Sequence, residues 1–474
     1  MWMIAIILGY FAVLFAISRL TGRKATNDAF FRGNRQSPWY MVAFGMIGAS
    51  ISGVTFVSVP GMVTSIDMTY MQTCIGFILG YIAVAFILLP LYYRLNLTTI
   101  YSYLGKRMGQ RAYKTGASFF LLSKMTGAVV RFYVVCMILQ QFVFDDMGIP
   151  FAVTVSGMVA LIWLYTRGGG IKTLVWTDTF QTVCLFSALL LIIYKVVGEL
   201  GMTIPEAISA IAADEHSRMF VMDDWVSKQN FWKQFLSGVF IVIVMTGLDQ
   251  DMMQKNLTCK SLKDAQKDMC TYGVAFVPAN LLFLSLGVLL VMLGESGVSD
   301  ALLPGFVQRS GLAVLIPFSI GIVAAAFSSA DSALTSLTTS YCVDIRGRAG
   351  DESLRKRAHL MISVLFVVMI MLFRMLNSTS VIDAIYTICG YTYGPLLGLF
   401  AFGMLTKRTP RDKYVPYICI ASPIVCYVID AITWNLAGYK FGYELLMMNG
   451  MLTFIALFVV SSRETPLAEF QTAS

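Results

Sequence analysis

The chain has 474 residues, of which 57% are hydrophobic and 13% are charged, and its formal net charge is +8. A soluble protein of this length could not bury so much apolar surface, so the composition excludes an ordinary soluble enzyme or binding module and indicates an integral membrane protein. The positive charge then fits the basic loops of a membrane protein, and it is no argument for a nucleic-acid partner.

About thirteen apolar runs are long enough to cross a bilayer as helices. The first lies in "MWMIAIILGYFAVLFAIS", which has neither a basic leader nor a small-residue cleavage site, so we expect a retained spanning helix rather than a signal peptide. In chain order the predicted spans are 2–18, 38–64, 69–93, 115–143, 150–166, 171–198, 231–252, 269–294, 311–341, 357–376, 380–404, 414–435 and 445–462.

The connections between these spans alternate in charge. Lysine and arginine gather in 19–35, 94–114, 167–172, 255–267, 346–357 and 407–413, and the other connections are poor in them. Because basic loops stay in the cytoplasm, the pattern predicts an N-terminus outside and a cytoplasmic C-terminal tail. The longest outside connection, 199–230, contains "IPEAISAIAAD", which fits either a short amphipathic helix or an ordinary surface loop.

Two blocks of five predicted spans, 38–198 and 231–404, each begin with a glycine-interrupted helix: "FGMIGASISGVTFVSVPG" and "SGVFIVIVMTGLDQD". An odd number of spans inserts the second block upside down relative to the first. Interrupted first helices in two inverted halves predict a transporter with a site at the bilayer midplane. The expected organisation is an N-terminal extra helix and first inside loop (1–37), the first repeat (38–198), an outside loop (199–230), the inverted second repeat (231–404), and two C-terminal helices with a short inside tail (405–474).

One predicted span carries a stripe of oxygen-bearing side chains. At about 100° per residue, the hydroxyls of "AAAFSSADSALTSL" (324–337) share one helix face, with Asp331 at its border. Hard monovalent cations such as Na⁺ prefer such oxygen donors. Small residues that merely let helices pack closely are the alternative reading of the serines. The acidic residue inside the membrane, Asp331, favours a functional reading of the stripe over the packing reading.

Three further charges lie within predicted spans. Asp178 is near the start of the sixth span, where it fits either a functional acid or a helix-end partner of Lys172. Arg131 is more than ten residues from either polar end of its span and costs at least about 2.5–3.5 kcal/mol there unless it is paired. It fits either a structural bridge to Asp178 or Asp331, or a fork that binds a substrate carboxylate. Lys124 is read as a structural or gating charge.

Together these segments resemble the sodium:solute symporter family over nearly the whole chain. The resemblance is carried by "GASISGVTF", "GGGIKTLVWTDTFQ", "GLDQDMMQKNL" and "AAAFSSADSALTSL", in this order and spacing. It implies an all-α integral membrane protein with a leucine-transporter-type fold, in which two inverted five-helix repeats follow one extra helix and precede two more.

The resemblance also implies cation sites. The main sodium site would use the backbone carbonyls of Gly48, Ile51 and Ala325 and the hydroxyls of Ser328 and Ser329. Some members have a second sodium site, whose residues correspond here to Asp178, Asp331 and Ser332. Asp331 stands where those members have a serine, which puts the geometry of that site in doubt.

For the solute, the resemblance favours the bacterial sialic acid transporters. The Glu-Gln pair of the sugar cotransporters is replaced by Val54-Thr55, which argues against a glucose-type sugar. The residues that correspond to the solute contacts of the sialic acid transporters are Ser50, Ser52, Thr55, Gln72 and Arg131.

The expected activity is therefore sodium-coupled symport, by alternating access, of a small organic solute, first of all a carboxylate such as sialic acid. The alternative is another monocarboxylate, or a neutral solute with a structural Arg131. We expect Na⁺ as the coupled ion, a monomer surrounded by membrane lipid in a bacterial inner membrane, no nucleic acid and no enzymatic activity. With two sodium ions and a monoanion, each cycle would move one net positive charge.

Overall fold

The structure is a computed structural model that describes residues 2–22, 26–225, 227–295, 297, 299–376, 381–439, 441–442 and 444–462. The predicted cytoplasmic tail after residue 462 lies outside these residues. The described chain is almost entirely helical, and its one small sheet pairs β1 (Thr409–Pro410) with β2 (Ser461–Ser462) in antiparallel fashion.

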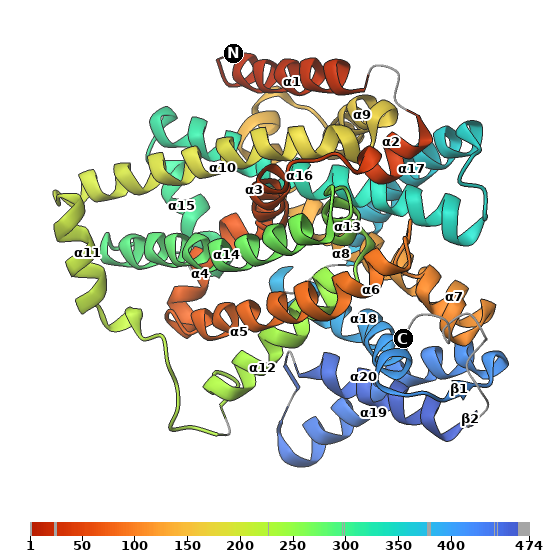
Figure 1. The fold of residues 1–474 in the computed structure, drawn as a ribbon. Coiled ribbons are helices and arrows are strands. Elements are labelled where there is room, and N and C mark those ends of the chain that lie inside the picture. The colour runs from red at the N-terminus through yellow and green to blue at the C-terminus, as the bar shows by residue number, and fades with distance from the viewer. Residues whose placement is uncertain are drawn as a thin grey trace.

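The α-helices, shown in Figure 1, are α1 (Trp2–Thr21), α2 (Asn27–Arg32), α3 (Trp39–Ser50), α4 (Gly53–Ile66), α5 (Tyr70–Ala83), α6 (Leu89–Arg94), α7 (Ser102–Met108), α8 (Gln110–Leu139), α9 (Phe151–Gly169), α10 (Ile171–Glu199), α11 (Ile204–Ala213), α12 (Phe231–Val242), α13 (Gln250–Asn256), α14 (Leu262–Met292), α15 (Leu302–Arg309), α16 (Leu312–Ser340), α17 (Glu352–Leu376), α18 (Val381–Leu405), α19 (Val415–Ala437) and α20 (Leu445–Val459). Short π-helical segments extend α5, α8, α12 and α16: η2 (Val84–Leu88), η3 (Gln140–Phe144), η6 (Ile243–Gly247) and η8 (Tyr341–Ile345).

Each predicted span falls on a helix or a pair of helices. Among the described residues, 9 helices are long and apolar enough to cross a membrane, and the number rises to 11 if each of two bent pairs is one span. Shorter apolar helices at Ile7–Thr21 and Leu445–Val459 occupy the first and last predicted positions. Among the described residues, length and composition therefore do not confirm the predicted count of thirteen.

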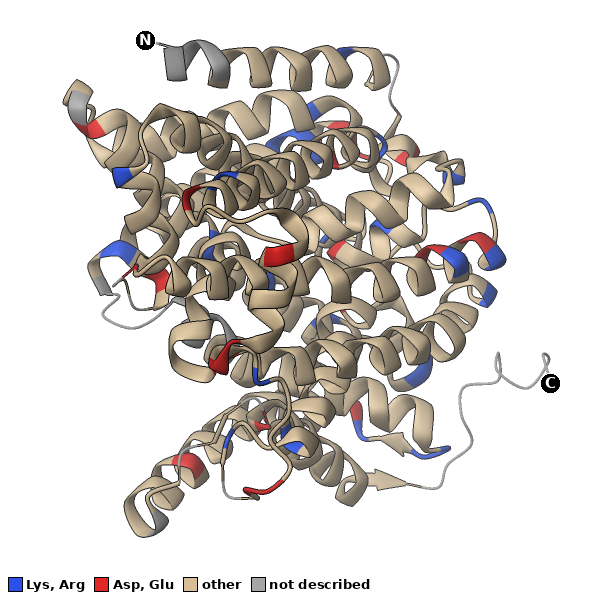
Figure 2. Cartoon of the chain, turned by 90° about the vertical axis from the view of Figure 1, so that its left-hand side faces the viewer, with Lys and Arg blue, Asp and Glu red and all other residues tan. Residues whose placement is uncertain are grey.

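The outer helices present apolar side chains away from the protein. In α19 only 22% of the most apolar 18-residue window is buried inside the protein, and in α17 only 33% is. Figure 2 shows how few positions along the ribbon carry a charge. An exposed apolar surface of this extent suits contact with lipid tails and would not be stable in water.

The connection 199–230, which the charge pattern predicts to lie outside, contains a helix. α11 begins with a capping box, in which the Thr203 side chain caps the backbone of the first turn and Glu206 accepts from the Thr203 backbone N–H at 2.7 Å. This pattern satisfies backbone donors that a helix start leaves free. Of the two readings of "IPEAISAIAAD", the structure therefore shows the short helix.

Two broken helices define the centre of the protein. α3 and α4 meet at a 61° bend, and α12 with η6 meets α13 at a 70° bend. α3 packs against α10, α14 and α16, while α4 packs against α14, α8 and α16, so the first break is enclosed by long helices (Figure 1). Both breaks fall where the sequence predicted glycine-interrupted helices.

Glycines let α3 approach α10 closely. A Cβ atom added to Gly48 would lie 1.9 Å from Thr182 Oγ1, and one added to Gly45 would lie 3.0 Å from the Cβ of Asp178. Interiors are packed too densely to absorb such an atom without a shift of one helix. The two glycines therefore fix the distance between the broken helix and the acid on α10.

We expect Gly48→Ala to lower the stability of the purified protein by about 1–3 kcal/mol, because the added methyl group overpacks the α3–α10 contact. The measurement is the melting temperature in sodium-free buffer. Gly157→Ala is the matched control, because a Cβ atom at Gly157 meets nothing within 4 Å. Equal melting temperatures for the two variants would contradict the close packing.

Candidate functional site

The break between α3 and α4 leaves backbone oxygens without helical partners. Helical bonding stops at the Ile51 N–H, which donates to Ile47 at 3.0 Å, and resumes at the Phe56 N–H, which donates to Ser52 at 3.1 Å. The carbonyls that lose an i+4 donor in this gap are those of Gly48, Ala49, Ser50 and Ile51, of which Ser50 accepts instead from the Ser52 N–H at 3.0 Å. Inside a membrane, such carbonyls need another donor, water or a cation.

α16 places hydroxyls opposite this break. Ser329 Oγ donates to the carbonyl of Ala49 at 2.9 Å and to that of Ala325 at 3.1 Å. A cavity of about 10 Å³, room for about one water-sized particle, lies beside Ala49, Ser52 and Ser329. All five predicted ligands lie on α3, on α16 or at Ile51, the residue that follows α3, and of the five only Ser329 lines this cavity. Lys124, Arg131 and Asp251 line it as well. The free carbonyls of the break and the hydroxyls of α16 are the kind of oxygen donor that a hard monovalent cation prefers.

The acids of the predicted second cation site have other partners. Asp178 Oδ2 lies 2.8 Å from the Lys255 ammonium, and Ser328 Oγ donates to Asp178 Oδ1 at 2.7 Å. Tyr165 Oη donates to Asp331 Oδ2 at 2.6 Å, and Ser332 Oγ donates to Asp331 Oδ1 at 3.3 Å. Asp331 and Ser332, which are neighbours in the sequence, are hydrogen-bonded to each other, and the predicted site omits the lysine that lies against Asp178. Lys172, the suggested helix-end partner, does not pair with Asp178.

Lys124 belongs to a second buried charge cluster. Its ammonium lies 3.2 Å from Asp249 and 2.6 Å from Asp251, and Tyr393 Oη donates to Asp249 at 2.6 Å. These contacts connect α8, the bend before α13, and α18. Because all four side chains are buried, the cluster fixes the relative positions of three helices, in keeping with the structural reading of Lys124.

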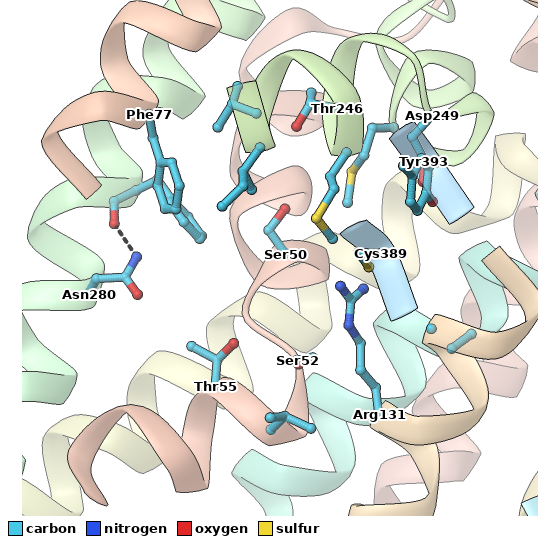
Figure 3. A pocket seen from close by; sticks show the side chains of 18 of the residues that line it. Ser50, Ser52, Thr55, Phe77, Arg131, Thr246, Asp249, Asn280, Cys389 and Tyr393 are labelled. Carbon is cyan, nitrogen blue, oxygen red and sulfur yellow. Dashed lines mark hydrogen bonds between the residues drawn. The ribbon is translucent and has the colours of Figure 1, made fainter. Parts of the chain in front are cut away.

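A polar cavity with a volume of about 120 Å³ lies beside the same break. Figure 3 shows the Arg131 side chain extending into it between Ser52 of the broken helix and Cys389 of α18. Thr55 and Ser50 line the side formed by the broken helix. Lining residues from the other helices include Lys124, Asp249, Thr246, Tyr272, Asn280 and Tyr393.

Four of the five residues predicted to contact the solute line this cavity: Ser50, Ser52, Thr55 and Arg131. Ser50 also shares a hydrogen bond with the Tyr272 hydroxyl. Gln72 does not line the cavity; its side chain donates to the carbonyl of Gln229 at 2.8 Å and accepts from the Val221 N–H at 3.0 Å. Its position therefore corrects the prediction: Gln72 holds the 199–230 connection against α5.

Sequence reasoning assigned no role to Asp249 or Asp251 and counted Lys255 among the basic residues of the connection 255–267, whereas Lys255 is buried against Asp178. All three lie in "GLDQDMMQKNL", which carried the family resemblance but was read only as a marker. The signal that could have found them is the same as for Arg131: charges next to an apolar run that spans the membrane. Their partners come from α8 and α10, more than 70 residues earlier, and spacing along the chain does not predict such pairs.

The model of the "Sodium:solute symporter family" matches residues 30–412. The chain belongs to this family. Its members are sodium-coupled transporters, so the protein is a multi-pass membrane symporter that uses sodium as the coupled ion.

Two relatives and one solved structure show how far the similarity extends. The sodium/sialic acid symporter of Proteus mirabilis is 25% identical over 449 residues, which cover 88% of this chain and 87% of the relative. The sodium-coupled monocarboxylate transporter 2 of Bos taurus is 26% identical and is matched over 83% of this chain and 67% of its own length. A Na⁺-coupled sialic acid symporter, solved in a substrate-bound outward-open state, superimposes with a TM-score of 0.81 at 20% identity and covers 98% of this chain and 99% of its own.

The structural match confirms the predicted fold class, an all-α membrane protein of the leucine-transporter type. The boundaries of the two repeats stay a prediction. The assignments of the sodium-binding and solute-binding residues likewise stay predictions.

We expect Ser329→Ala to weaken sodium activation of the symporter. The variant removes one oxygen ligand, worth about 1–2 kcal/mol, and the sodium concentration for half-maximal transport should rise roughly five- to thirty-fold. Ser336→Ala is the matched control, because Ser336 also lies on α16 and its hydroxyl donates to the carbonyl of Ala333 in its own helix. An unchanged sodium dependence in Ser329→Ala would exclude this hydroxyl as a ligand.

Proposed function

We propose that the symporter imports a small carboxylate, with sialic acid (N-acetylneuraminate) as the first candidate. The observation that carries the proposal is the position of Arg131. Its guanidinium faces the polar cavity, and no carboxylate oxygen of the described residues lies within the 4.0 Å limit of an ion pair.

An unpaired arginine is costly at this depth. Placing an arginine at the centre of a membrane helix costs at least about 2.5–3.5 kcal/mol. The structural alternative needed Asp178 or Asp331 as its partner, but Asp178 pairs with Lys255 and Asp331 accepts from Tyr165. A planar fork that faces a cavity is suited to bidentate binding of a carboxylate.

The remaining cavity wall suits a solute with several polar groups. Ser50, Ser52 and Thr55 offer hydroxyls on one side, and Asn280 and Thr246 lie on the other. Phe77 and Tyr70 add apolar surface. A sugar acid with hydroxyls and an acetamide matches this mixture better than a short monocarboxylate does. The name of the Proteus mirabilis relative points to the same solute.

Transport would follow alternating access. Sodium between α3 and α16 would connect the broken helix to its neighbour and thereby fix Ser50, Ser52 and Thr55 for the solute. Binding of both ligands would shift the population from outward-open to inward-open states. Each sodium ion that enters contributes about 2.3 kcal/mol per 100 mV, besides its concentration gradient. We further propose a monomer in a bacterial inner membrane, with the N-terminus outside, the C-terminus cytoplasmic and no enzymatic activity.

We expect Arg131→Gln to lower the affinity for sialic acid more than tenfold, because each hydrogen bond to a charged group contributes about 1.5–3 kcal/mol. Uptake of labelled N-acetylneuraminate into proteoliposomes measures the effect, with uncharged N-acetylmannosamine as a competitor that lacks the carboxylate. Arg111→Gln, an exposed position on the same helix, is the control and should leave uptake unchanged.

Two outcomes would contradict the carboxylate assignment. If Arg131→Gln kept its solute affinity and only lost melting temperature, Arg131 would be structural. If N-acetylmannosamine or another uncharged solute were transported in preference to the acid, the symporter would carry a neutral cargo.

A further inference from the structure

The Lys255 ammonium lies where the family resemblance placed a second sodium ion. It is 2.8 Å from Asp178 Oδ2, and only 2% of the lysine side chain and 1% of the aspartate side chain are exposed. Asp251, whose carboxylate lies 2.6 Å from the Lys124 ammonium, and Asp331, which accepts from Tyr165 and Ser332, have partners of their own. Among the described residues, Asp178 is thus paired with a monovalent cation that belongs to the chain itself.

The remaining oxygen of Asp178 is also engaged. Ser328 Oγ donates to Asp178 Oδ1 at 2.7 Å, so the ammonium and the hydroxyl occupy the two sides of the carboxylate. A sodium ion bound by Asp178 and Asp331 would have to lie beside the ammonium. Two positive charges at such a distance repel strongly in a buried site, where the effective dielectric constant is low. The residues present at the second site therefore do not fit a second sodium ion.

The substitution at position 331 fits this arrangement. The resemblance gives a serine there, whereas this chain has an aspartate that accepts from Tyr165 at 2.6 Å and from Ser332 at 3.3 Å. Both carboxylate oxygens of Asp331 therefore already have hydrogen-bond donors within the protein, which a second sodium ion would have to displace or share.

We propose that Lys255 permanently occupies the second cation site, so that one sodium ion, bound between α3 and α16, drives each transport cycle. The inference rests on the proposed function, because it sets the ion count of that same transporter. With a monoanionic solute, one sodium ion makes the cycle electroneutral, in contrast to the net positive charge that two ions would carry.

The first test counts ions on the unmodified protein and needs no solute. At saturating ²²Na⁺, we expect one bound ion per protein molecule. Two bound ions would overturn the proposal. No bound sodium would overturn both the proposal and the sodium coupling on which it depends.

The second test exchanges the ammonium for a neutral group of similar shape. In Lys255→Met, Asp178 loses its cation, and we expect a second ²²Na⁺ ion to bind. Lys260→Met, an exposed position shortly after α13, is the control and should keep one ion. A folded Lys255→Met protein that still binds one ion would overturn the proposal. If this variant does not fold, the count on the unmodified protein still decides.

The third test measures transport and separates the two hypotheses. In proteoliposomes with labelled N-acetylneuraminate, we expect a sodium-to-solute flux ratio of 1 and no transport current. A ratio of 2 with an inward current would overturn the single-ion cycle and leave the solute assignment intact. No uptake of N-acetylneuraminate, together with one bound ²²Na⁺ ion, would refute the solute and support the ion count.

Discussion

The arrangement of the centre follows from one constraint: a backbone polar group inside a bilayer must find a partner within the protein or from a bound ion. The break between α3 and α4 removes the helical donors from the four carbonyls of residues 48–51. One of them, Ala49, accepts from Ser329 of α16. Those of Gly48 and Ile51 create a local need for positive charge, which a sodium ion can satisfy. The hydroxyls on α16 and a bound sodium ion would therefore meet the same requirement, which is to give partners to the carbonyls that the helix break leaves free.

The same constraint applies more strongly to charge. Buried carboxylates are stable only when paired, and removing one partner of a buried pair is strongly destabilising. Asp178 has Lys255, and Asp249 and Asp251 share Lys124. Arg131 differs from these residues because its guanidinium faces a cavity and forms no ion pair with a described carboxylate. A site for an anionic solute requires a cationic side chain without a carboxylate partner in the protein, because the solute carboxylate can then become that partner.

Much of this could be predicted from the sequence, because apolar length and loop charge are local properties. The spans, both broken helices and the stripe on α16 follow from runs of about 20 residues and from helical periodicity. Gln72 could not be placed in this way: its partners lie near positions 221 and 229 of a long connection. Lys255 was missed for a related reason, because its role depends on an ion pair with Asp178, which lies 77 positions earlier in the chain. The depth of a charge can be read from one helix, whereas its partner depends on how several helices pack.

The position of Ser328 suggests that the two cation sites are coupled. Its hydroxyl has one proton, and that proton is donated to Asp178. The lone pairs of the oxygen are then directed away from Asp178, where they can face a sodium ion, just as a partner behind a metal ligand fixes the ligand's orientation. Lys255 holds Asp178 in place and thereby holds Ser328 as well. In the proposed cycle the ammonium therefore has two effects that a mobile ion could not combine: it would balance a buried carboxylate throughout the cycle, and it would keep a hydroxyl oriented for sodium before sodium binds. A permanent cation behind the site would leave the ion between α3 and α16 as the one that binds and dissociates in each cycle.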